Sequence, residues 1–206
     1  MITPPTIRDL AGIEPLVVLR HDEDLAAQLR PFLFRLDPLP VAYWLGNLAI
    51  LLVVVRLAIR SGSLYLGLSQ ACMGMVMGYL LLLPLHEGLH ALAYRLLGCA
   101  GAQVIYRWRT LTAFCVADRV VLAAGSFSLV CLAPSLLLNP LLGLAVALTS
   151  GVPQLLTAGA LLLHLGAASG DLALLNLLWV HRGRGLYTYD DVAARVSCFV
   201  SWPTTP

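Results

Sequence analysis

Four long apolar segments limit how this chain can fold more than any other feature. They cover about residues 40–58, 64–97, 120–148 and 153–180. A helix needs about 20 apolar residues to cross a bilayer core about 30 Å thick, so length alone allows several spans. The chain is 59% hydrophobic and 12% charged, and its mean hydropathy is +0.84, which is too apolar for a soluble domain of 206 residues. We therefore predict an all-α polytopic membrane protein with about four transmembrane helices embedded in a lipid bilayer.

The segments outside these runs suggest how the chain is organised. We expect residues 1–39 to form a polar or interfacial segment, residues 40–180 to form the transmembrane domain, and residues 181–206 to form a short tail. Apolar and polar side chains alternate after Gly98, as in Val104 to Arg109, so we predict a short surface β-hairpin between the second and third spans. The run 120–148 is interrupted by prolines, and we favour one kinked or tilted span there over two.

The arginines indicate an orientation. All thirteen basic residues are arginines, and with four spans all of them except Arg56 and Arg60 fall on one side of the membrane. Because cytoplasmic segments carry the excess of positive charge, we expect both termini to be cytoplasmic. The formal net charge is only +2 and no basic cluster exists, so the sequence offers nothing for nucleic acid.

Inside the second apolar run, three polar side chains stand where apolar ones are expected. His86, Glu87 and His90 form the pattern His-Glu-x-x-His. At helical pitch, residues i and i+4 lie on one face about a turn apart, so both imidazoles can bind one metal ion. Two imidazoles supply half of a tetrahedral zinc site, and a neighbouring glutamate can take a proton from a zinc-activated water. The motif predicts Zn²⁺ held by the two histidines, with Glu87 as the catalytic base.

A catalytic zinc usually has three protein ligands, so a third must come from elsewhere. One soluble zincin type uses a later glutamate as its third ligand, but no glutamate follows Glu87. Another type uses a histidine six residues after the second one, but position 96 is leucine. Both types are therefore excluded. Of the later aspartates, Asp171 alone lies inside an apolar run, where a lone carboxylate costs about 2.5–3.5 kcal/mol. We predict that Asp171 is the third ligand. The alternative is a buried carboxylate paired with Arg95 or hydrogen-bonded to Ser169.

His164 precedes Asp171 by seven residues and therefore lies on nearly the same helix face. It could be a fourth ligand, a hydrogen-bond partner that orients a ligand, or a stabiliser of an oxyanion. The alternative is a packing histidine without a role in the site. Ser169 is a further candidate for orienting the ligands.

These residues resemble the putative zincin peptidase family of small bacterial membrane proteins, which is related to the site-2 protease group of intramembrane metalloproteases. The resemblance rests on His86-Glu87-Gly88-Leu89-His90-Ala91, with Gly98 eight residues after the second histidine, and on Ala-Ala-Ser-Gly-Asp-Leu at 167–172. It covers about residues 64–180. It implies zinc bound by His86, His90 and Asp171, with Glu87 catalytic, in a bacterial cytoplasmic membrane.

We therefore expect a zinc-dependent endopeptidase, intramembrane or membrane-embedded, that hydrolyses peptide bonds of membrane-associated peptides or proteins. The alternative is a non-catalytic membrane protein whose zinc site is structural or senses metal. A transporter is less consistent with four spans. The sequence assigns no oligomeric state.

Overall fold

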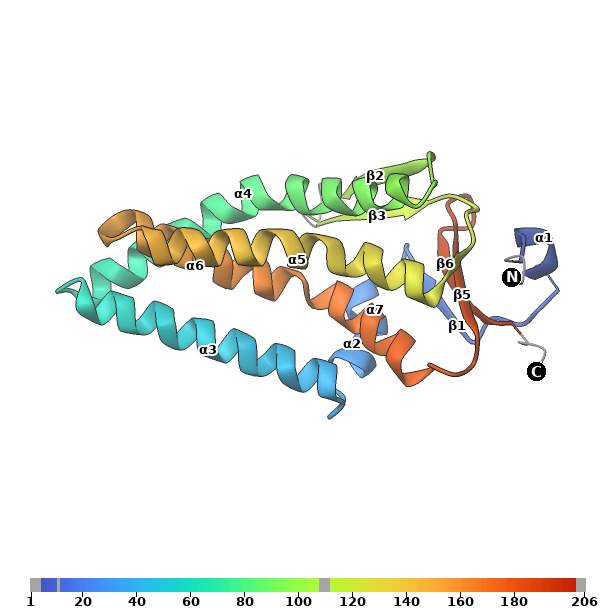
Figure 1. The fold of residues 1–206 in the computed structure, drawn as a ribbon, viewed down its shortest axis with the longest axis horizontal. Coiled ribbons are helices and arrows are strands. Elements are labelled where there is room, and N and C mark those ends of the chain that lie inside the picture. Colours follow the sequence, from blue (N-terminus) through green and yellow to red (C-terminus); the bar gives the residue numbers. More distant parts are fainter. Residues whose placement is uncertain (1–4, 11, 108–111, 203–206) are drawn as a thin grey trace.

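The computed structural model describes residues 5–10, 12–107 and 112–202. Its long helices are α3 (Pro38–Arg60), α4 (Leu64–Leu96), α5 (Ala124–Leu148), α6 (Gly151–Ala167) and α7 (Ser169–Val180). Figure 1 shows them running roughly along the long axis of the molecule, with α7 continuing the direction of α6. Four helical segments are long and apolar enough to cross a membrane, with α6 and α7 counted as one. This confirms the prediction of a membrane protein with about four such helices.

One of the predicted spans differs in detail from what the sequence suggests. The last one breaks at Ala168 into α6 and α7, where glycine and serine at 166–170 weaken helix formation. In contrast, α5 continues through Pro134 and Pro140 as one helix, in agreement with the expectation of a single span. Helix α4 likewise continues through Pro84, and at 1.5 Å per residue its 33 residues extend about 50 Å.

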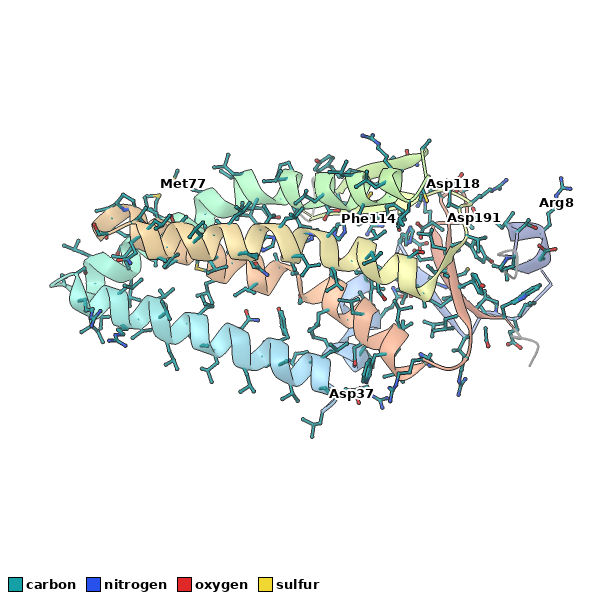
Figure 2. The ribbon with its side chains drawn as sticks, viewed as in Figure 1. Arg8, Asp37, Met77, Phe114, Asp118 and Asp191 are labelled. Atoms are coloured by element: carbon teal, nitrogen blue, oxygen red, sulfur yellow. The ribbon has the colours of Figure 1, made fainter. Side chains whose placement is uncertain are left out.

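Helix α6 packs against α3, α4 and α5, and its contact with α4 is the most extensive between any two described elements. Glycines make this contact possible. A Cβ atom on Gly74 of α4 would overlap the carbonyl oxygen of Leu156, and one on Gly159 of α6 would overlap that of Ala71. The two backbones therefore touch directly, as small residues allow in membrane helices. Met77, on the outer side of α4, is 47% exposed and points away from the other helices in Figure 2.

We predict that Gly74→Ala lowers the free energy of unfolding by about 1–3 kcal/mol, because the added methyl group must push α4 away from α6. The matched control is Gly143→Ala in α5, where an added Cβ meets no atom within 4 Å. That change should be neutral or slightly stabilising, since alanine favours helix more than glycine. Thermal melts of the two variants in detergent would compare them, and equal melting temperatures would contradict the prediction.

Two small sheets lie at the end of the molecule that holds both termini (Figure 1). Strands β2 (Ala102–Arg107) and β3 (Thr112–Ala117) pair antiparallel beside α4, in the segment where the sequence predicts a hairpin. The position of this pair at a membrane surface stays a prediction. The second sheet has the order β1-β6-β5-β4 and is antiparallel throughout. Its strands are β1 (Val17–Arg20), β4 (Leu122–Ala123), β5 (Leu186–Asp191) and β6 (Val196–Ser201).

The expectation of an all-α chain with one hairpin is therefore incomplete, because the four-stranded sheet was not predicted. It joins the N-terminal segment to the C-terminal tail through β1 and β6. The buried positions of β5 alternate along the strand, but two of them are Thr188 and Asp190, so hydrophobicity alone does not indicate a strand there. Asp191 ends β5, and Asp118 lies near it in Figure 2.

Two short helices complete the fold, α1 (Ile7–Leu10) and α2 (Leu25–Leu33). The carboxylate of Asp24 accepts hydrogen bonds from Ala26 N and Ala27 N and so caps α2. Helix α2 packs against α7, where the buried Asn176 donates to the carbonyl of Phe32 at 2.8 Å. This contact holds the N-terminal segment against the helix that carries Asp171.

Candidate metal centre

Helix α4 carries the three residues of the His-Glu-x-x-His motif, and all three are buried. The Nε2 atoms of His86 and His90 lie 3.1 Å apart. Their rings meet edge to face with centroids 4.7 Å apart. The i, i+4 spacing on one helix thus aims both imidazoles at the same point, as the sequence predicts.

Asp171 reaches the same point from the first turn of α7. Its Oδ2 lies 3.0 Å from His86 Nε2, and its Oδ1 lies 3.3 Å from His90 Nε2. The break between α6 and α7 precedes Asp171 by three residues and sets the direction of this turn. No hydrogen bond joins Ser169 to Asp171 or to either histidine among the described residues, and the nearby Tyr43 hydroxyl donates to the carbonyl of Gly166. The structure therefore brings together His86, His90 and Asp171, although Asp171 lies 85 residues after His86 along the chain.

Hydrogen bonds on the far side of each imidazole fix which nitrogen carries the proton. His90 Nδ1 lies 2.8 Å from the carbonyl oxygen of Val130, which can only accept, so the proton is on Nδ1. His86 Nδ1 lies 3.1 Å from His164 Nε2, and His164 Nδ1 lies 2.7 Å from Asn139 Oδ1. If Asn139 accepts from His164, then His164 accepts from His86. Both Nε2 atoms then present lone pairs toward Asp171.

This donor set fits a divalent metal ion. Two imidazole lone pairs and a carboxylate face one another at 3.0–3.3 Å, an arrangement that is repulsive without a cation between them. Asp171 Oδ2 is buried and has no hydrogen-bond donor among the described residues, although His86 Nε2 is close, because that nitrogen carries no hydrogen. Ligands of a tetrahedral zinc with bonds of about 2.0–2.1 Å stand about 3.3 Å apart, close to these separations.

Glu87 lies beside the point where His86, His90 and Asp171 converge, but it is not the third ligand that the geometry favours. One possible ligand atom from each of His86, Glu87 and His90 lies within 4.8 Å of the others, so these three side chains could also hold a metal ion. The carboxylate of Asp171 is closer to both imidazoles, and we take it as the better third ligand. Glu87 Oε2 is buried without a hydrogen-bond partner among the described residues. It is therefore available to exchange a proton.

A cavity of about 770 Å³ opens onto these side chains. Its walls come from α4, α5, α7 and β3, from β5 and β6, and from the N-terminal segment around β1 and α2. Consecutive β3 residues 113–116 line it, among them Phe114, which Figure 2 labels. The lining also includes several polar residues that the sequence analysis did not connect with the site, namely His21, Asp22, Glu23, Asp24, Arg107, Asp190 and Ser197.

Sequence reasoning also missed Asn139 and the carbonyl of Val130. A backbone carbonyl leaves no signal in the sequence. Asn139 did leave one, since an amide inside an apolar run needs a hydrogen-bond partner, but the sequence does not indicate which residue that partner is. His164 was among the candidates for orienting a ligand, and its position against His86 agrees with that alternative.

We predict that His164→Ala weakens zinc binding about 10- to 100-fold, because His86 then loses the acceptor that fixes its proton on Nδ1. Leu161→Ala is a suitable control, since Leu161 is equally buried and lies one turn earlier on α6. It should lower thermal stability through a cavity but leave zinc affinity unchanged. Competition with a zinc chelator would measure both affinities, and equal values would show that His164 only packs.

Among the comparisons with known proteins, one family matches the part of the chain that contains these residues. The model of the putative zincin peptidase family matches residues 79–183, which includes His86, Glu87, His90 and Asp171. The matched segment is slightly more than half of the chain, and the chain belongs to this family. No curated protein and no solved structure matches it. A zinc metallopeptidase in a membrane is the class of protein that family and fold together indicate.

Proposed function

We propose that this protein is a zinc-dependent endopeptidase that cleaves membrane-associated polypeptides at a site enclosed by its membrane-spanning helices. His86, His90 and Asp171 are the zinc ligands and Glu87 is the general base. One observation carries the proposal. Two imidazole nitrogens and a carboxylate converge beside a buried, unpartnered glutamate, and all four side chains line one cavity. Membership of the family supports peptide hydrolysis as the reaction.

Zinc bound there would polarise the scissile carbonyl and lower the pKa of the attacking water. Glu87 accepts the proton of that water as its oxygen attacks the carbonyl carbon, and then passes the proton to the leaving amine nitrogen as the C–N bond breaks. The absence of a competing donor at Glu87 Oε2 among the described residues suits this exchange. The partners of His86 and His90 keep both imidazoles oriented throughout.

The substrate must enter the cavity in an extended form, because a helix hides its own carbonyl groups. Strand β3 supports this requirement. Its residues 113–116 line the cavity, and its pairing partner β2 occupies only one of its edges. A peptide that adds to the other edge by β-augmentation would expose its carbonyls to Glu87.

The arginine distribution supports a cytoplasmic location for both termini. Arg56 and Arg60 end α3 at the far end of the bundle, opposite the sheets and both termini in Figure 1. The other described arginines belong to segments at the sheet end, where the positive-inside rule places the cytoplasm.

Metal removal tests the proposed function. We expect purified protein in detergent to contain one zinc per chain and to cleave an unfolded probe such as casein. A chelator should abolish cleavage, and added zinc should restore it. If zinc is present and its removal melts the fold, while neither casein nor a membrane-anchored peptide is cleaved, the site is structural or sensory.

A further inference from the structure

A second polar cluster lines the cavity of the metal centre, and the proposed mechanism does not use it. His21 follows β1 and is buried, with 5% of its surface exposed. Its Nε2 lies 2.8 Å from Ser197 Oγ on β6. Ser197 in turn donates to Asp190 Oδ1 on β5, and Asp190 Oδ2 accepts from Ala117 N of β3 at 2.9 Å. His21, Ser197 and Asp190 all line the cavity.

These bonds determine the proton position on His21. The hydroxyl hydrogen of Ser197 is donated to Asp190, so Ser197 Oγ must accept from His21 Nε2–H. Burial lowers the pKa of His21, and the charge of Arg107 lowers it further, while Asp22 acts in the opposite direction. The imidazole is therefore neutral at pH 7, and its Nδ1 carries a lone pair. No hydrogen bond to Nδ1 is found among the described residues.

The ring is also held in place from the side of β3. His21 meets Phe114 edge to face, with centroids 5.2 Å apart and an interplanar angle of 61°. Phe114 belongs to the four β3 residues that line the cavity. His21 thus stands next to the strand along which an extended peptide would lie. A sphere of 770 Å³ is about 11 Å across, which three extended residues span at about 3.3 Å each.

We infer that His21 is a substrate-binding residue, whose Nδ1 accepts a hydrogen bond from a backbone N–H of a peptide lying in the cavity. The contact falls within about three residues of the bond that is cleaved. Ser197 and Asp190 are positioning residues that hold the imidazole in the accepting tautomer. This inference rests on the proposed peptidase function, and it assigns to the cavity a subsite that binds main-chain donors and not a particular side chain.

Two substitutions separate binding from structural support. An asparagine side chain at position 21 would place its carbonyl oxygen close to the position of the histidine Nδ1. His21→Asn therefore keeps the acceptor and loses the contact with Ser197. A glutamine side chain at position 21 would place its amide nitrogen close to the position of the histidine Nε2. His21→Gln therefore keeps the contact with Ser197 and loses the acceptor. Binding is measured by fluorescence anisotropy of labelled casein in the Glu87→Gln background, where the probe is not cleaved.

We expect His21→Gln to weaken casein binding about five-fold, the loss expected for one neutral hydrogen bond. In the otherwise wild-type protein it should raise KM and leave kcat unchanged. His21→Asn should bind casein within two-fold of the parent, although it melts at a lower temperature. The inference would be overturned if His21→Gln bound casein as tightly as the parent protein. It would also be overturned if only His21→Asn lost casein binding, together with thermal stability.

The two proposals fail differently. If wild-type protein cleaves casein and His21→Gln matches it in KM and affinity, only the role of His21 is wrong. If zinc-loaded wild-type protein cleaves nothing, the proposed function is wrong, and the anisotropy measurement still decides whether His21 binds peptide.

Discussion

Replacing Glu87 by glutamine is expected to abolish peptide cleavage while bound zinc stays at the wild-type level. Glutamine has the same shape as glutamate, but its amide cannot take the proton of the attacking water. A positioned general base contributes about 10²- to 10⁴-fold, so residual cleavage should be lower by at least that factor. The unpartnered Oε2 of Glu87 makes a purely structural role for this carboxylate poorly supported.

Glu23→Gln is the matched control, because Glu23 is the other glutamate that lines the cavity. Its only described ion pair is a contact of 3.6 Å with Arg20, and both side chains are exposed. This substitution should leave casein cleavage within two-fold of wild type. Full activity in Glu87→Gln would remove Glu87 as the base. Loss of zinc in that variant would instead make Glu87 a ligand, as its distance from the two histidines allows.

Asp171→Ala should lower the affinity for zinc by more than 100-fold. Removing a residue that only orients a ligand already costs about 10- to 100-fold, and here a charged ligand itself is lost. Its carboxylate is the only described acidic group within 3.3 Å of both Nε2 atoms. Two neutral imidazoles from one helix would then hold the ion alone. Metal analysis after dialysis against a weak chelator measures this loss directly.

Asp190→Asn provides the comparison for Asp171→Asn. Both aspartates line the cavity, but Asp190 accepts hydrogen bonds from Ser197 and Ala117 and lies outside the metal centre. Burial raises the pKa of Asp190, so a neutral amide is tolerated there better than at a metal ligand. We expect Asp190→Asn to keep its zinc and Asp171→Asn to lose it. Normal zinc affinity in Asp171→Asn would return Asp171 to a structural role.

The close contact of α4 with α6 has a consequence for the metal centre. His86 is on α4, and His164, which hydrogen-bonds it, is on α6. The glycines at 74 and 159 set the separation of these two helices earlier along the same interface. Side chains larger than glycine there would move His164 away from His86 as well as destabilise the bundle. A site whose geometry depends on fractions of an ångström gains from such a rigid interface.

The sequence by itself determined the spans and the centre of the site. Apolar runs of about 20 residues or more admit few alternatives to membrane helices, since the length requirement is set by the bilayer. His86 and His90 share a helix face because of the helical repeat alone, and their convergence in the structure follows from it. Asp171 was found because a carboxylate in an apolar run is costly without a partner. Each of these arguments uses only local spacing or local composition.

Only the tertiary structure decided what surrounds that centre. The sheet that closes the cavity pairs β1 with β6, across nearly the whole length of the chain, and β1 is four residues long. Short strands with polar residues at buried positions, such as Asp190, carry no periodic hydrophobic signal. The partners of the histidines, Asn139 and the Val130 carbonyl, come from a helix distant in sequence. Local patterns specify which face of an element is apolar, whereas the choice of partner across the fold depends on packing and hydrogen bonds that form only when the chain is assembled.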